Sequence, residues 1–230
     1  MDDHEPFEAP VNPIPPVIVL LVLAVVLVEA AFSLASTGIV GGTRGIGWRN
    51  TGIADYAFSP TVLSIMYEQG NYAPEITRRF VTYPFIHSSF TQALFGGALL
   101  LALGKFVGDI FRAIPVLIIF FGSTIAGAVA FGLTAPSGSP LISVFTPVYG
   151  LIGAYTYIIW LHLGQTGANQ LQAFRMIGFL LCIQLVFGAI FGAGQMWIAE
   201  ITGFVAGFVL SVIVAPGGWS NLLRKLRTRS

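Results

Sequence analysis

Residues 143–155 read SVFTPVYGLIGAY and residues 197–207 read WIAEITGFVAG, and these two stretches decide how the chain folds. Both are mostly apolar, and each carries two glycines: Gly150 and Gly153 in the first, Gly203 and Gly207 in the second. Small residues at such spacings let two membrane helices approach closely. We therefore expect the two stretches to form helices that pack against each other inside a membrane.

The composition of the whole chain indicates a polytopic membrane protein. Hydrophobic residues make up 55% of the 230 residues, charged residues make up 9%, and 27 residues are glycine. A membrane-spanning helix needs about 20 mostly apolar residues. Six stretches qualify: residues 17–36, 84–104, 113–133, 141–161, 174–193 and 196–214. The sequence thus predicts an all-α polytopic membrane protein, a six-transmembrane-helix bundle whose first partner is the lipid bilayer.

Charge and cysteine content argue against several classes of function. The net charge of +1 argues against nucleic acid as a partner. The single cysteine, Cys182, lies in an apolar run without a disulfide partner, so redox chemistry is not expected. The sequence contains no metal-ligating pattern and no nucleotide-binding loop. We expect no cofactor and no metal ion.

The chain divides into one membrane domain with a tail at each end. Residues 1–16 form an acidic, proline-rich N-terminal tail, residues 17–215 form the membrane domain, and residues 216–230 form a basic C-terminal tail. Lys and Arg gather on the cytoplasmic side of membrane proteins. With six spans, more of the Lys and Arg residues fall on the side of the membrane that holds both termini than on the other side. This distribution predicts an inner-membrane or plasma-membrane protein with both termini in the cytoplasm.

The loop at residues 37–80 is far longer than the other connections, and such loops usually carry structure or function. By the orientation above it is extracytoplasmic. It contains a cluster of apolar and aromatic residues, interrupted by Pro60: Tyr56, Phe58, Val62, Leu63, Ile65, Met66 and Tyr67. Two interpretations are open. We favour a short element lying in the membrane interface, and the alternative is an irregular loop exposed to solvent.

A third stretch, residues 78–96 (RRFVTYPFIHSSFTQALFG), completes the pattern. Together the three stretches resemble the rhomboid family of intramembrane serine proteases. That family has a Trp-Arg pair followed by phenylalanine, threonine and a histidine, then a second histidine and an asparagine. Arg79, Thr82 and His87 match this pattern. The resemblance implies a six-helix rhomboid-like fold with the same orientation, and a first loop that embeds sideways in the outer leaflet.

The resemblance also implies where the catalytic residues of the family would stand, and this chain departs from the family there. The first catalytic helix of the family begins with Gly-x-Ser-Gly, which puts Phe145 at the nucleophile position, and Glu200 stands at the position of the basic histidine. Gln92 and Gly96 replace the two donors to the oxyanion, while the tyrosine that stacks on the base is retained as Tyr149. The resemblance therefore implies a degenerate catalytic site, that is, a pseudoprotease.

The residues themselves offer poor substitutes for this machinery. Acyl transfer needs a hydroxyl or thiol next to a base. Ser143 and Thr146 carry hydroxyls, but on a helix they are rotated by about 200° and about 100° from residue 145. His162 lies about 26 Å from residue 145 along a helix axis. His87 is nearer, and we interpret it as a structural histidine that hydrogen-bonds the first loop.

Glu200 is an ionisable residue inside a predicted membrane helix, which makes it a functional hypothesis by default. It shares a helix face with Gly203, Phe204 and Gly207, so we expect it to point into the bundle. Three interpretations are open: a structural hydrogen bond to Tyr149 or to a trapped water, which we favour, a contact to a bound client helix, and a role in proton or ion conduction. Glu29 is the other acid clearly within a span, and we interpret it as an interior or snorkelling residue.

These observations favour a rhomboid-like integral membrane protein that is proteolytically inactive and binds or stabilises the transmembrane segment of another membrane protein. Its former active-site cavity is expected to be lined by His87, Gln92, Gly96, Ser143, Phe145, Thr146, Tyr149 and Glu200. One alternative is an active rhomboid serine endopeptidase. A second is a structural subunit of a larger membrane complex, in which Phe145 plugs the cavity. A transporter or channel ranks lower, because the two halves show no matching interrupted helices.

Overall fold

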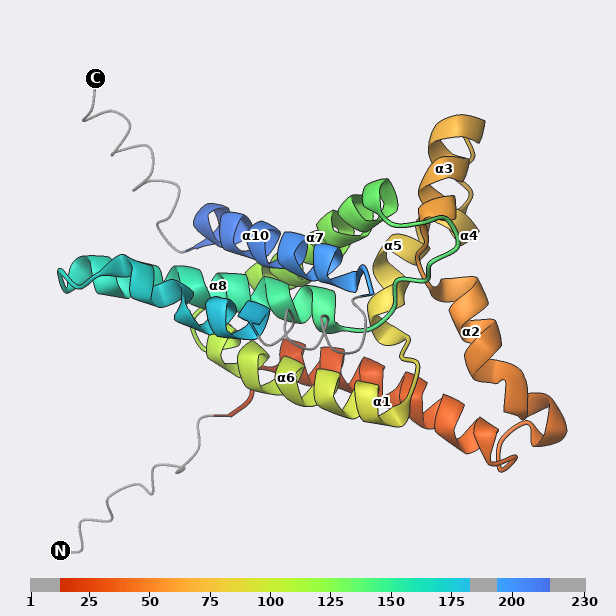
Figure 1. Ribbon diagram of the computed structural model, residues 1–230. Helices are drawn as coiled ribbons and strands as arrows, with labels where there is room; N and C mark the ends of the chain where they lie inside the picture. Colours follow the sequence, from red (N-terminus) through yellow and green to blue (C-terminus); the bar gives the residue numbers. More distant parts are fainter. Residues whose placement is uncertain (1–12, 183–193, 216–230) are drawn as a thin grey trace, which may run out of the picture.

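The computed structural model describes residues 13–182 and 194–215, which are built from α-helices and short 3₁₀ turns (Figure 1). The long helices are α1 (Pro16–Ser36), α6 (Phe90–Gly108), α7 (Ala113–Thr134), α8 (Phe145–Gln165) and α10 (Met196–Val214). By length and composition α1, α6, α7 and α10 can each cross a membrane. The prediction of an all-α membrane bundle is confirmed.

The helices agree with the predicted spans at three places and differ at the others. The first, third and sixth predicted spans coincide with α1, α7 and α10 to within one residue. The second was wrong at its start, because Tyr83–Phe85 form a 3₁₀ turn and α6 begins only at Phe90, capped by the Ser89 hydroxyl that accepts the N–H of Gln92. The fourth is α8. Of the fifth, Gln170–Cys182 is helical and residues 183–193 lie outside the described residues.

Helix α8 lies at the centre of the bundle and packs against α6, α7 and α10. Every residue from Thr146 to Ala154 is buried, as expected for a helix with neighbours around its whole circumference. Figure 1 shows α8 running between α10 and α6. Its first turn includes Pro147, which is tolerated there because the first N–H groups of a helix have no intrahelical partner. Phe145, which the resemblance puts at the nucleophile position, thus begins the most enclosed helix of the bundle.

The loop at residues 37–80 is largely helical. It contains η1 (Gly42–Gly47), α2 (Trp48–Tyr56), α3 (Pro60–Gln69), α4 (Pro74–Thr77) and the start of α5 (Arg79–Thr82), which leads into η2 (Tyr83–Phe85). The alternative of an irregular loop was therefore wrong. An antiparallel bridge between Phe58 and Leu141 fixes the loop to the segment before α8. Its position in the membrane interface stays a prediction.

The loop and the first turns of α6, α8 and α10 all lie at one end of the bundle (Figure 1). At this end the Thr82 hydroxyl donates to the Tyr56 carbonyl at 2.9 Å, and the Arg79 guanidinium donates to the Ala57 carbonyl at 3.2 Å. The start of α1 and the end of α10 lie at the opposite end. The fold therefore places residues 87, 145 and 200 at the end of the bundle that carries the first loop.

Candidate functional site

The segment that leads into α8 turns at Ser143, whose φ angle is +85°. Among the described residues Ser143 is the only non-glycine with a positive φ, a conformation that costs free energy for a residue with a Cβ atom. Two hydrogen bonds hold it there, because its N–H points at the carbonyls of Tyr83 at 3.1 Å and Ile86 at 2.7 Å. Its hydroxyl is buried and has no hydrogen-bond partner within the described part of the chain.

Phe145 is the first residue of α8 and is partly exposed, whereas Thr146 is buried. The Thr146 methyl group lies where a Cβ at Gly127 of α7 would stand, and its carbonyl lies 2.5 Å from where a Cβ at Gly203 of α10 would stand. Thr146 of α8 therefore packs between α7 and α10. Because neighbouring residues of a helix are rotated by about 100°, its hydroxyl is not expected at the place of a serine hydroxyl at position 145.

Helices α8 and α10 meet backbone to backbone at Gly150, Gly153, Gly203 and Gly207, which we call the glycine contact. A Cβ atom at Gly207 would overlap the backbone of Gly150, and one at Gly153 would overlap the carbonyl of Phe204. Only glycine fits at these positions, and so the close approach predicted from the sequence is present.

Glu200 lies on α10, one turn before Gly203, and is buried with 9% of its surface exposed. It is near enough to Tyr149 of α8 for the two groups to interact electrostatically. Tyr149 is itself buried. The two side chains that the sequence singled out as partners are therefore brought together inside the bundle, and the hydrogen bond between them stays a prediction.

His87 lies in the turn before α6, outside the membrane-spanning helices, and is fully buried. Its Nε2 atom accepts the N–H of Val144 at 3.4 Å, which requires this nitrogen to be unprotonated. Burial lowers the pKa of His87 to about 4, because the charged imidazolium would lose its hydration. The carbonyl of His87 accepts a hydrogen bond from Arg49 of the first loop at 2.7 Å. The imidazole thus bonds the segment before α8, and it is the backbone carbonyl of His87, not the imidazole, that bonds the first loop.

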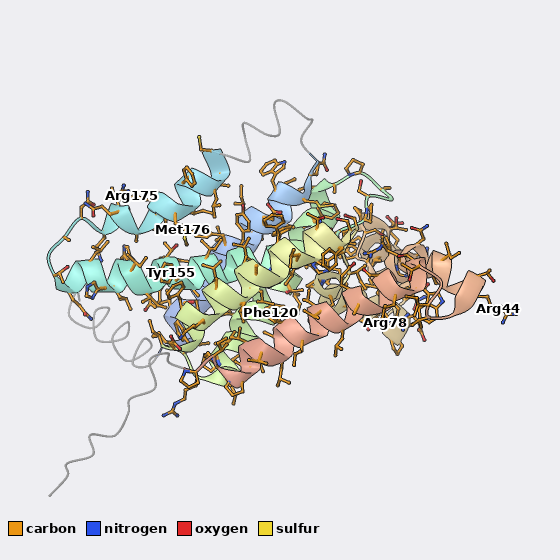
Figure 2. All side chains as sticks on the ribbon, turned by 90° about the horizontal axis from the view of Figure 1, so that it is seen from below. Arg44, Arg78, Phe120, Tyr155, Arg175 and Met176 are labelled. Carbon is orange, nitrogen blue, oxygen red and sulfur yellow. The ribbon has the colours of Figure 1, made fainter. Side chains whose placement is uncertain are left out.

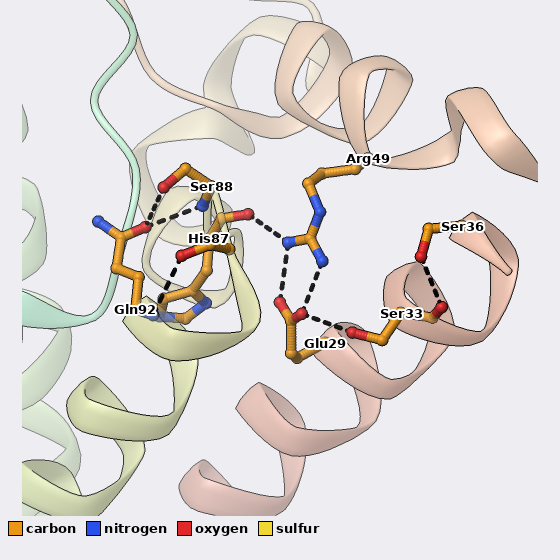
Figure 3. Close-up of polar contacts among 8 residues, drawn as sticks. Glu29, Ser33, Ser36, Arg49, His87, Ser88 and Gln92 are labelled. Atoms are coloured by element: carbon orange, nitrogen blue, oxygen red, sulfur yellow. Dashed lines mark hydrogen bonds and ion pairs between the residues drawn. The ribbon is translucent and has the colours of Figure 1, made fainter.

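The two oxyanion-donor positions of the family are filled differently here. A Cβ atom at Gly96 would lie 2.6 Å from Cγ1 of Val144 and 3.6 Å from Nε2 of His87. The fully buried Val144 side chain thus takes up the space that a larger residue at position 96 would need. Gln92 accepts hydrogen bonds through Oε1 from the Ser88 N–H at 2.8 Å and the Ser88 hydroxyl at 2.9 Å, which holds the start of α6 (Figure 3).

A cluster that sequence reasoning missed joins the first loop to α1 (Figure 3). The Arg49 guanidinium donates to both carboxylate oxygens of Glu29, at 2.9 and 2.6 Å, and the Ser33 hydroxyl donates to the same carboxylate at 2.8 Å. Arg49 also donates to the His87 carbonyl. We call Glu29, Arg49 and His87 the polar corner. Glu29 is therefore an interior residue with a specific partner. The only indication of this in the sequence was an acidic residue within an apolar span.

No described residues form a group of three or more His, Cys, Asp or Glu side chains that could hold a metal ion. A cavity of about 340 Å³ lies near the other end of α8, lined by residues that include Tyr157, Leu161 and His162. None of the candidate residues borders this cavity. The candidate site is thus the region around residues 87, 145 and 200, apart from this cavity.

Comparison with known proteins agrees with this geometry. No curated protein sequence matches the chain. The rhomboid domain family matches residues 74–217, from the end of the first loop through α10. The match covers more than half of the chain and contains every candidate site position from His87 to Gly207. This integral membrane protein therefore belongs to the rhomboid family.

Proposed function

We propose that this protein is a proteolytically inactive rhomboid that binds or stabilises the transmembrane segment of another membrane protein. The observation that carries the proposal is the pair of residues at the two catalytic positions. Phe145 has no group that can attack a carbonyl, and Glu200 is a poor replacement for a histidine base when it is buried in a membrane helix.

The surroundings of these positions support the loss of activity. Hydrolysis also needs donors aimed at the developing oxyanion, and removing one such donor typically costs a factor of about 10² to 10³ in rate. Here position 96 is glycine, which has no side-chain donor, and Val144 fills the space beside it. The nucleophile, the histidine base and one side-chain donor of the family are thus lacking together.

Binding of a transmembrane helix is the activity that survives such losses. Polar groups buried in a membrane bundle are costly unless they have partners, and the Ser143 hydroxyl, just before α8, is buried without a hydrogen-bond partner among the described residues. A polar residue in a client helix offers a suitable partner for this region. We also propose that both termini face the cytoplasm, with residues 17–215 as the single membrane domain and the first loop outside.

Photo-crosslinking from position 145 tests client binding. A photoreactive amino acid replaces Phe145 in the full chain in native membranes, and captured species are identified by mass spectrometry. The matched control carries the same group at Leu27, an exposed position on α1. We expect an intact membrane protein, captured through its transmembrane segment, from position 145 and not from position 27. Capture of lipid alone from both positions would contradict client binding and favour a structural subunit that uses its outer surface.

An active serine endopeptidase is the second candidate, and Ser143 is the observation that favours it. This serine has a strained backbone and a buried hydroxyl without a partner among the described residues, and its N–H donates to the carbonyls of Tyr83 and Ile86 in the turn just before His87. A serine-directed fluorophosphonate separates the two functions. We expect no labelling of the native protein. Labelling that disappears in Ser143→Ala would establish Ser143 as a nucleophile and overturn the inactive assignment.

A further inference from the structure

Arg78 lies between α4 and α5 in the first loop and forms no ion pair with another described residue. Its guanidinium carbon lies 4.4 Å from the centroid of the Tyr56 ring, a cation–π contact. Its Nε atom is buried and has no hydrogen-bond partner in the described part of the chain. Across residues 13–182 and 194–215 the ion pairs are Arg49 with Glu29 and Lys105 with Asp109, and neither involves Arg78.

The neighbouring arginines of the same loop show what is unusual about Arg78. Arg49 is neutralised by the Glu29 carboxylate, and Arg79 donates to the carbonyls of Glu75 and Ala57. Each has acceptors within the fold. Because an arginine stays ionised in proteins, and because a charged donor without an acceptor costs free energy, Arg78 is the arginine of this group that requires an acceptor from outside.

The surroundings of Arg78 indicate the chemistry of that acceptor. The ring of Tyr56 covers one face of the guanidinium, and Nε is covered, so the terminal amino groups of this partly exposed side chain are the donors left. Tyr56, Tyr67 and Tyr72 of the same loop are exposed, and exposed tyrosines are typical of the membrane–water interface. The acceptors found at that interface are phosphate groups, whose geometry suits the planar fork of arginine.

We propose that Arg78, held against the Tyr56 ring, binds the phosphate group of a phospholipid headgroup at the membrane surface beside the first loop. The proposal goes beyond the proposed function and does not depend on whether the chain is proteolytically active. Arg44 of the same loop is the natural comparison, because it is exposed and lies at the outer edge of the molecule, apart from Arg78 (Figure 2).

The test measures thermal unfolding of the full-length protein in an uncharged detergent, with added dioleoyl phosphatidylglycerol or with dioleoylglycerol, which has the same chains and no phosphate. We expect phosphatidylglycerol to raise Tm of the native protein and of Arg44→Gln, and Arg78→Gln to lose more than half of that shift. Dioleoylglycerol should leave Tm unchanged in all three proteins.

Three outcomes would count against the proposal. An equal response to phosphatidylglycerol in Arg78→Gln and the native protein would overturn it, and so would an equal loss in Arg44→Gln. If inorganic phosphate alone reproduced the shift, the lipid assignment would be overturned in favour of a soluble anion. Should Arg78→Gln not fold, Arg78→Lys keeps the charge without the planar fork. The lipid-induced shift should then be smaller than in the native protein, and an unchanged shift would again overturn the proposal.

Discussion

The glycine contact and the polar corner position the same site by opposite means. At the glycine contact, α8 and α10 meet through backbone atoms, and no side chain lies between Gly207 and Gly150. At the polar corner, the Arg49 side chain reaches from the loop to Glu29 on α1 and to the His87 carbonyl before α6. The glycine contact holds two helices by the fit of their backbones, so an added side-chain atom would disrupt it. The polar corner holds a loop by charge, so the loss of one charged partner would disrupt it.

The glycine contact should be the more sensitive of the two. We expect Gly207→Ala to destabilise the protein by about 4 kcal/mol or more, above the usual cost of overpacking, because the added methyl meets the Gly150 backbone, which cannot rotate away. Gly97→Ala is the matched control. Gly97 is also a buried helical glycine, but a Cβ atom there meets nothing within 4 Å, so the change should stabilise α6 by about 0.5 to 1 kcal/mol. Denaturant unfolding in detergent measures both.

Removal of one partner of the polar corner should destabilise the protein. We expect Arg49→Met to cost about 3 kcal/mol, the lower end of the range for a broken buried pair, because 21% of the Arg49 side chain is exposed while Glu29 is left charged and buried. Asp109→Asn, which breaks the exposed pair with Lys105, should cost less than about 0.5 kcal/mol. Adding Glu29→Gln to Arg49→Met should recover part of the loss. Equal costs for the two single variants would contradict the buried character of the corner.

The polar corner should also respond to pH through His87, and the glycine contact should not. The pKa of His87 is lowered to about 4 from an ordinary value of 6.5, so between these values the unfolded chain binds more protons than the folded one. The contribution of neutral His87 to the free energy of unfolding is therefore complete above about pH 6.5. It is lost as the pH drops toward 4, by about 3 kcal/mol in all. Protonation would also remove the acceptor for the Val144 N–H.

Unfolding followed from pH 7.5 to pH 4 checks this expectation. His87→Gln should flatten the acid limb of the stability curve, because no imidazole is left to charge. The control is His162→Gln, which removes an exposed histidine near the end of α8 and should leave the curve unchanged. An acid limb that persists in His87→Gln would assign the pH response to another group.

The two regions also differ in how well the sequence predicts them. Gly150, Gly153, Gly203 and Gly207 could be assigned to a helix contact because the absence of a side chain has one structural meaning at that spacing, whatever the partner. The polar corner could not be assigned, because Arg49 and Glu29 are twenty residues apart, and an acid within an apolar span does not indicate which basic residue is its partner. Sequence patterns thus predict contacts that depend on one residue type and miss those that depend on a pair.

The start of α6 was misplaced for a related reason. Tyr83, Pro84 and Phe85 are apolar enough to extend a span, but they turn toward the core, and the Tyr83 hydroxyl donates to the Thr124 carbonyl of α7 at 2.9 Å. Hydropathy measures burial and does not distinguish burial in lipid from burial in protein. The same turn supplies the two carbonyls that hold Ser143, so this error in the predicted boundary fell on a segment that shapes the site.

The smallest expected effect lies between the two regions, at Ser143. Glycine adopts a positive φ without strain, and the family pattern has a glycine at this position, so Ser143→Gly should stabilise the protein by about 1 kcal/mol by removing both the strain and a buried hydroxyl without a partner. Gly138 has the same φ of +85° in an open turn, and Gly138→Ser should destabilise the protein by about the same amount. Thermal unfolding of the two variants side by side measures the difference. If Ser143→Gly destabilised the protein instead, the Ser143 hydroxyl would contribute more than its backbone strain costs, and it would have to be treated as a functional group of the site.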